Sequence, residues 1–225
     1  MIKTMCLVAA AALSLVAGSA RAEPIKSTFT LVGQTFNFTV PDGFCPLDDQ
    51  TRPLADTLAA ADTQNQTDLS YFECSLSKTG GAPKRYGIIK TPKGSLLGVL
   101  PPRAELLKQF AAAISDGSLA AAMKKTDFNG AASKALKDAT GIENKIAGEP
   151  KIIEADDKAA YLVGLINISN ATANNTVALT AAVTEVKGRM FFIYFYKTDS
   201  SFADLAPGLA EVKRQVAGFI ADNGG

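Results

Sequence analysis

Four strand-like runs separated by short turns occupy the last third of the chain. Turn-forming residues stand between them at Asp156-Asp157, Asn174-Asn175 and Lys187-Gly188. Strands that follow one another at such short intervals favour an antiparallel meander. The runs are GEPKIIEAD (148–156), KAAYLVGLINIS (158–169), NTVALTAAVTEV (175–186) and RMFFIYFYKTD (189–199).

The run 190–196 indicates how the sheet is covered. Phe191, Ile193 and Phe195 are apolar, and the residues between them are also large and mostly apolar. Alternate side chains of a strand point to opposite faces, so both faces are expected to be buried. Helical periodicity at 103–115 and 205–219 supplies the cover. The sequence therefore predicts an α+β fold with a central antiparallel sheet that helices cover on both faces.

The remaining segments add further predicted elements. The run 27–40, STFTLVGQTFNFTV, is rich in Thr, Phe and Val around Gly33-Gln34, which predicts a hairpin with its turn there. Thr51 as a cap and Pro53 in the first turn predict a helix over the stretch 51–65. Strands are expected at 68–77 and 85–92, and two short helices at 118–125 and 130–138.

The N-terminal segment MIKTMCLVAAAALSLVAGSARAEP has the three parts of a secretory signal peptide. Lys3 gives a positive start, an apolar run follows, and Ala20-Arg21-Ala22 is a small-residue cleavage site. The expected products are a signal peptide, 1–22, and a single exported domain, 23–225. An uncleaved anchor is the alternative. The alanine-rich core indicates a bacterial periplasmic or secreted protein.

Export changes the cysteine count. Removal of the signal peptide takes away Cys6 and leaves Cys45 and Cys74 in an oxidising compartment. The two are predicted to form a disulfide that ties the loop 41–50 to the run LSYFECSLS. A redox-active pair is the alternative, although the spacing is not C-x-x-C.

Two stretches resemble the PsbP-like proteins, which include bacterial DcrB-like periplasmic members. They are FNFTVPDGF (36–44) and RMFFIYFYKTDSSFADLAPGLAEVKRQVAGFI (189–220), together with the order of the predicted elements. Phe44 stands where such proteins often carry Trp after the turn. The resemblance implies a PsbP-like fold and a non-catalytic accessory or binding role, with no catalytic residues to transfer.

The chain contains no histidine, which restricts its chemistry. Ser-His-Asp and Cys-His catalysis are excluded, and so are zinc sites of the usual kinds, because the two remaining cysteines are predicted to be bonded. We expect no metal and no cofactor. A histidine-independent hydrolase stays open as an alternative, since Ser75 and Lys78 match S-x-x-K, but no S-D-N element accompanies them.

Charge is unevenly distributed along the chain. Signal removal leaves 21 basic against 22 acidic residues, so no nucleic-acid partner is expected. The charged residues within 42–73 are mainly acidic, whereas no acidic residue lies between Glu73 and Glu105. This basic window is either ordinary solvated loop charge or a patch that binds an anionic lipid surface, a polyanionic glycan or an acidic protein partner. The candidate residues are Lys78, Lys84, Arg85, Tyr86, Lys90, Lys93 and Arg103.

The sequence therefore predicts an exported, non-catalytic accessory or binding protein that acts through surface contacts. A small-ligand or lipid carrier is a further alternative, in which the aromatic run 190–196 would line a cavity between sheet and helices. Apart from the signal segment, no stretch is typical of a transmembrane helix.

Overall fold

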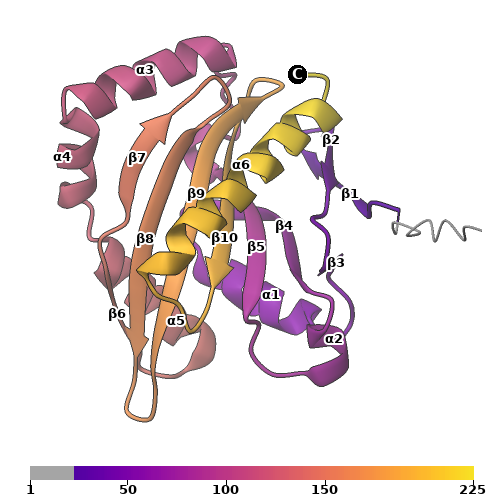
Figure 1. Ribbon diagram of the computed structural model, residues 1–225, viewed down its shortest axis with the longest axis vertical. Helices are drawn as coiled ribbons and strands as arrows, with labels where there is room; N and C mark the ends of the chain where they lie inside the picture. The colour runs from indigo at the N-terminus through magenta and orange to yellow at the C-terminus, as the bar shows by residue number, and fades with distance from the viewer. Residues whose placement is uncertain (1–22) are drawn as a thin grey trace, which may run out of the picture.

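The computed structural model describes residues 23–225, so the expected signal peptide, 1–22, lies outside the described residues (Figure 1). The strands are β1 (Lys26–Leu31), β2 (Gln34–Thr39), β3 (Phe44–Pro46), β4 (Asn65–Glu73), β5 (Arg85–Pro92), β6 (Lys145–Gly148), β7 (Lys151–Ala155), β8 (Ala160–Ser169), β9 (Asn174–Val186) and β10 (Arg189–Lys197). The helices are α1 (Arg52–Ala61), α2 (Leu76–Thr79), α3 (Arg103–Ser115), α4 (Ser118–Lys125), α5 (Phe128–Thr140) and α6 (Leu205–Asp222), with short 3₁₀ turns η1 (Lys93–Ser95) and η2 (Phe202–Asp204).

One large antiparallel sheet organises the described residues. Its order is β3-β4-β5-β10-β9-β8-β6, and β7 also pairs with β8. The predicted α+β class and the predicted meander of β8, β9 and β10 are confirmed. The neighbour of β10 on its other side is β5, which lies about a hundred residues earlier in the chain. Short-range turn signals could not reveal that pairing.

The first strand of the predicted meander divides in two. The expected strand at 148–156 is replaced by β6 and β7, which pair with successive parts of β8. Pro150 lies between them. A proline has no N–H to donate to a strand ladder, so the pairing is interrupted there and restarts at Lys151.

The N-terminal hairpin forms with its turn one residue earlier than predicted. Leu31 pairs with Gln34, so Val32 and Gly33 form the turn. Both have positive φ, 48° and 76°. A two-residue turn of this type matches the twist of the flanking strands, and glycine adopts its conformation without strain.

The strand expected at 68–77 is shifted toward the N-terminus. β4 begins at Asn65 and ends at Glu73, and residues 76–79 form the short helix α2 instead. The carbonyl of Ser75 accepts from the N–H groups of Lys78 and Thr79, which closes the helical turn. Gly80, with φ of 65°, then ends it.

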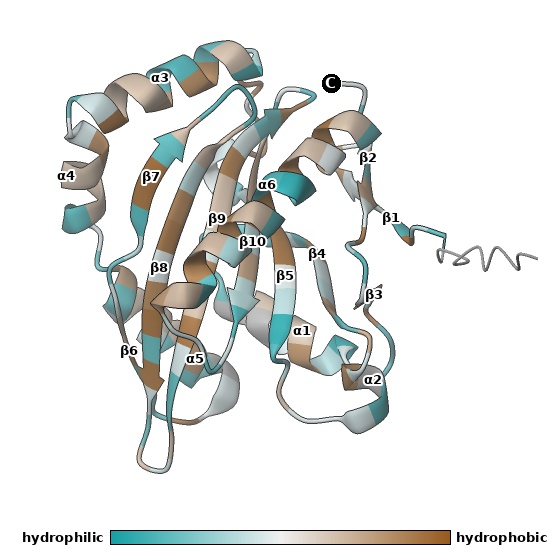
Figure 2. Cartoon of the chain, viewed as in Figure 1, coloured by the Kyte–Doolittle hydropathy of each residue, from teal (hydrophilic) through white to brown (hydrophobic). Residues whose placement is uncertain are grey.

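The main core lies between the sheet and α6. Phe219 of α6 is surrounded by the rings of Phe29, Phe36, Phe38 and Phe191, with centroid distances from 5.1 to 6.3 Å. Figure 2 shows β8, β9 and β10 as largely hydrophobic strands, with α6 crossing in front of them. Elsewhere α1 contacts β4, and α5 contacts both α1 and β6.

Residue 87 of β5 must be a glycine because the side chain of Tyr71, its partner on the neighbouring strand β4, lies directly over it. A Cβ at this position would lie 2.0 Å from Cζ and Oη of Tyr71. The Tyr71 ring is fully buried, and its hydroxyl donates to Oε1 of Gln215 in α6 at 2.5 Å. The absence of a side chain at residue 87 therefore leaves room for the hydrogen bond that joins β4 to α6.

Candidate binding surface

The basic window and the acidic stretch before it lie side by side in the structure. β4 and β5 form an antiparallel pair, so acidic residues in and just before β4 face basic residues of β5. Arg85 Nε lies 2.7 Å from Glu73 Oε1, and Lys90 Nζ lies 2.6 Å from Asp62 Oδ2. Lys93 Nζ also donates to the carbonyl of Asp62 at 3.3 Å. Acidic and basic residues that are separate in the sequence therefore partly neutralise each other across the β4–β5 pair.

The other residues of the window lie in different surroundings. Lys78 and Lys84 are exposed. Tyr86 stacks on Tyr196 with a centroid distance of 4.7 Å, and burial raises the pKa of its hydroxyl. Arg103 begins α3 and donates to the carbonyl of Glu185 at 3.4 Å. An anion-binding role for the window stays a prediction.

A loop that sequence reasoning missed carries the most exposed apolar side chains in this region. Residues 96–102, LLGVLPP, connect η1 to α3 and contain no polar side chain; we call this segment the apolar loop. Leu97 is 91% exposed and Val99 is 79% exposed. Leu96, in contrast, packs against the main core. The loop is thus anchored at its start and presents two aliphatic side chains to water.

Arg189, the first residue of β10, holds the apolar loop in place. Its side chain is only 8% exposed, and Nη1 donates to the carbonyls of Leu96 at 2.8 Å and Gly98 at 2.6 Å. Nε is buried without a hydrogen-bond partner, and within residues 23–225 the guanidinium forms no ion pair. Burying a charge without an ion-pair partner is unfavourable, and the two hydrogen bonds to the loop carbonyls offset only part of that cost.

The backbone of the β9–β10 turn provides a second attachment. Leu100 donates its N–H to the carbonyl of Gly188 at 3.0 Å. Gly188 has φ of 77°, and a Cβ there would lie 3.1 Å from Cγ1 of Val99. Glycine thus supplies both the turn conformation and the space for Val99. The exposed side chains are consequently carried by a loop whose backbone is fixed.

A pocket of about 290 Å³ lies between α1 and the outer edge of β4, and we call it the α1–β4 pocket. β3 pairs only with the last part of β4, which leaves this edge open. Asp68 is the extra residue of a β-bulge, because the register shifts between Thr67 and Leu69. The lining residues are Pro46, Leu47, Arg52, Ala55, Asp56, Ala59, Thr67, Asp68, Leu69 and Ser70.

The carboxyl group of Asp68 has an unusual environment. It accepts hydrogen bonds from Thr91 Oγ1 at 2.6 Å and Gln66 Nε2 at 2.9 Å. Burial nevertheless raises the pKa of Asp68 to about 6. The hydroxyl of Thr67 is buried without a hydrogen-bond partner. Bulges often redirect side chains at functional sites, so the pocket is a second candidate site.

Replacing Asp68 by asparagine is expected to remove one pH-dependent contribution to stability. The folded pKa of about 6 lies above the ordinary value of 3.8, so the folded state retains a proton that the unfolded state has lost. Wild-type stability therefore falls as pH rises through this window, by at most about 3 kcal/mol and by about 1–2 kcal/mol after solvent screening. Urea unfolding of both proteins at about pH 4 and about pH 7 measures the difference. If the difference in unfolding free energy between wild type and variant were the same at both pH values, the raised pKa would be contradicted.

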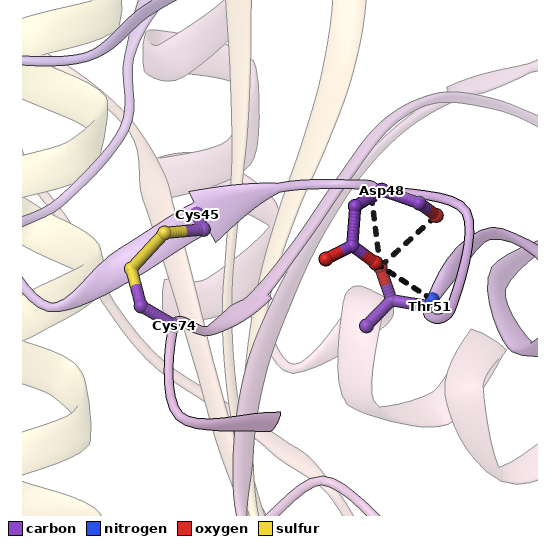
Figure 3. The surroundings of a disulfide bond; sticks show 4 residues. All are labelled: Cys45, Asp48, Thr51 and Cys74. Carbon is purple, nitrogen blue, oxygen red and sulfur yellow. Dashed lines mark hydrogen bonds between the residues drawn. A yellow bond between two sulfur atoms is a disulfide. The ribbon is translucent and has the colours of Figure 1, made fainter. Parts of the chain in front are cut away.

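The disulfide ties to the sheet the segment that continues into Pro46 and Leu47 of the α1–β4 pocket. Cys45 of β3 and Cys74, just after β4, are bonded, with their Cα atoms 4.9 Å apart. Figure 3 shows the bond near Asp48 and Thr51. The Asp48 carboxylate accepts from the Thr51 hydroxyl at 2.8 Å and from the Thr51 N–H at 2.9 Å, immediately before α1. These contacts fix the chain that forms one wall of the pocket.

A third feature is a pocket of about 440 Å³ between the start of α3 and the end of α6. Arg103, Asp157, Glu185 and Lys187 contribute charge to its wall. Glu185 accepts the N–H of Gly188, and Lys187 donates to the carbonyl of Thr35 and to Asn223 Oδ1. These contacts join the β9–β10 turn to the N-terminal hairpin and to α6.

Among residues 23–225, no group of three or more Cys, Asp or Glu side chains is placed to hold a metal ion. No helix in this part of the chain combines the length and apolar character needed to span a membrane.

The chain was also compared with known proteins. No family model matches it, and no curated protein matches it. Among solved structures, it is similar to the Ran-binding protein Mog1p of Saccharomyces cerevisiae, with 14% identity and a TM-score of 0.34. The similarity covers 89% of this chain and 94% of that chain. The resemblance to PsbP-like proteins stays a prediction.

Proposed function

We propose that this chain is an exported, periplasmic or secreted, non-catalytic accessory or binding protein that acts through surface contacts. In this proposal residues 23–225 form a single domain of PsbP-like build, with helices over both faces of the sheet. Tyr71 of β4 lies in the main core with α6, whereas its neighbour Phe72 packs with Ala55 of α1. Alternate side chains of a strand point to opposite faces, which supports that arrangement.

The apolar loop is the observation that carries the proposal. Fully burying a leucine or valine side chain is worth about 1.5–3 kcal/mol, a stabilisation that Leu97 and Val99 forgo in the isolated protein. Arg189 meanwhile keeps a buried charge to fix the loop backbone. Apolar side chains on a rigid backbone lose little entropy on binding, which favours their use as anchors.

A small-ligand role is the second candidate, and the α1–β4 pocket favours it. The pocket lies near the lower limit of ligand-binding volumes, which are about 300–1,000 Å³. Asp68, which lines the pocket and has a raised pKa, could accept a hydrogen bond from a small polar ligand. The run 190–196 is less suited to line a carrier cavity, since Phe191, Ile193 and Phe195 are buried in the core.

Site-specific cross-linking tests the proposal. A benzophenone-bearing amino acid is placed at residue 97 in the full chain, and matched protein carries it at residue 202. Phe202 is 79% exposed and lies before α6, whereas the apolar loop contacts the β9–β10 turn near the end of α6. The 18-residue helix separates these ends by about 27 Å.

Irradiation of producing cells is expected to give adducts at residue 97 and few at residue 202. Adducts to protein or to lipid would both support a contact surface at the loop. Equal labelling at both positions, or labelling at residue 202 alone, would contradict it. Fractionation of the same cells tests export, because a full-length protein confined to the cytosol would overturn that part of the proposal.

A further inference from the structure

We propose that the apolar loop docks on an anionic lipid bilayer, with Leu97 and Val99 entering the boundary between headgroups and acyl chains. This inference rests on the proposed function, because it specifies what the binding surface contacts. It concerns a peripheral contact made by a loop. The side chains, the backbone hydrogen bonds and the neighbouring charges each support it.

Several backbone groups of the loop are hydrogen-bonded within the protein, which makes these groups compatible with a bilayer. The N–H groups of Gly98 and Leu100 donate to Ser95 and Gly188, and the two prolines at 101 and 102 have no N–H. The carbonyls of Leu96 and Gly98 accept from Arg189. A protein partner could supply such bonds itself, but the apolar part of a bilayer cannot. These bonded groups can approach lipid without losing hydrogen bonds to water. Within residues 23–225 no hydrogen bond is made by the N–H groups of Leu97 and Val99, so we place the loop backbone at headgroup depth and only the two side chains deeper.

The side chains of the loop are equally suited to shallow insertion. No residue from 96 to 102 carries a polar side chain. Leu97 and Val99, which flank Gly98 in the sequence, are exposed, while Leu96 remains packed against the core. Two aliphatic groups can enter the boundary region without removing any charged or hydrogen-bonding side chain from water.

Basic residues stand near the loop and favour an anionic surface. Lys93 precedes it and is exposed, and Arg103 follows it. Lys187, beside Gly188, is exposed; its Nζ donates to the uncharged Thr35 carbonyl and Asn223 Oδ1, which leaves its positive charge uncompensated within residues 23–225. The nearby carboxylates are largely engaged, because Asp157 pairs with Lys158 at 3.0 Å and Glu185 accepts from Gly188; Glu105 is exposed. Juxtamembrane Lys and Arg side chains strengthen binding to anionic lipid and are screened by salt.

The chain offers a clean reporter for this contact, since it contains no tryptophan. Leu97→Trp places a single indole on the apolar loop, and Phe202→Trp places one at a site of comparable exposure at the other end of α6. Each protein is mixed with vesicles of phosphatidylglycerol and phosphatidylethanolamine, or of phosphatidylcholine alone. Tryptophan emission is recorded, and quenching by brominated acyl chains reports depth.

On anionic vesicles, Leu97→Trp is expected to emit at shorter wavelength and to be quenched, and Phe202→Trp is expected to do neither. Co-sedimentation measures the affinity for anionic vesicles without introducing a tryptophan. This affinity should fall about tenfold or more in the double variant Leu97→Ser/Val99→Ser, and little in Phe202→Ser. Equal emission shifts at both positions, equal shifts on phosphatidylcholine, or no shift at residue 97 would each overturn the inference.

The vesicle result can fail without the proposed function failing. If residue 97 cross-links to a protein in cells but gives no emission shift on vesicles, the loop is a protein-binding surface and the lipid inference is wrong. If residue 97 neither cross-links in cells nor responds to vesicles, both fail. Because Leu97 and Val99 are exposed, the substitutions are expected to leave the thermal unfolding temperature unchanged. Measuring that temperature checks that each variant is folded.

Discussion

Replacing Phe219 by alanine is expected to lower the free energy of unfolding by about 3–5 kcal/mol. The ring is fully buried where α6 meets the sheet, and it contacts aromatic rings from the N-terminal hairpin and from β10. Its removal leaves a cavity that neighbours on three separate elements can fill only in part. Urea unfolding followed by circular dichroism measures the loss.

Phe202→Ala is the matched control, because that ring is 79% exposed; a change within about 0.5 kcal/mol is expected. The shape of the transition is also informative. If residues 23–225 form one domain, Phe219→Ala should shift a single cooperative transition. A variant that unfolds in two separate steps, or that loses less than about 1 kcal/mol, would contradict the central position assigned to Phe219.

Replacing both Cys45 and Cys74 by serine is expected to cost about 3–4 kcal/mol. The bond closes a loop of 29 positions, and the chain-entropy estimate for that length gives this magnitude. The bridge also holds β3 against the end of β4, where Phe44 pairs with Glu73. Without it, the chain that leads through Asp48 and Thr51 into α1 is tied to the sheet less firmly.

The measurement compares unfolding of wild type and the double variant with and without reductant. Reductant should destabilise the wild type to about the level of the variant and leave the variant unchanged. A wild type that is insensitive to reductant, together with two alkylatable thiols, would show that the bond does not form in the protein as produced. That outcome would also count against export to an oxidising compartment.

Local sequence determined much of the architecture because its causes are local. Hydrophobic alternation and short turns specify β8, β9 and β10, and periodic apolar residues specify α6. The boundaries were less certain where a single residue decided them. Pro150 divided a predicted strand, and Gly80 helped residues 76–79 to form a helical turn.

The candidate surface depended on contacts between distant residues. The seven apolar residues of the loop are visible in the sequence, but their meaning comes from Arg189, which lies some ninety positions later. The charge window shows the opposite case. Its basic residues suggested an anion-binding surface, but strand pairing places Arg85 and Lys90 beside Glu73 and Asp62.

Side-chain periodicity and composition are local properties, and they sufficed to predict most strands and helices and the cysteine pair available for bonding; residues 76–79, a helical turn that begins within a predicted strand, are an exception. Three features could be seen only in the folded chain: β10 lies beside β5, Asp68 is partly buried on a bulge, and Arg189 holds the apolar loop. These features arise from contacts between segments far apart in the chain, and their energies depend on burial that no single segment specifies.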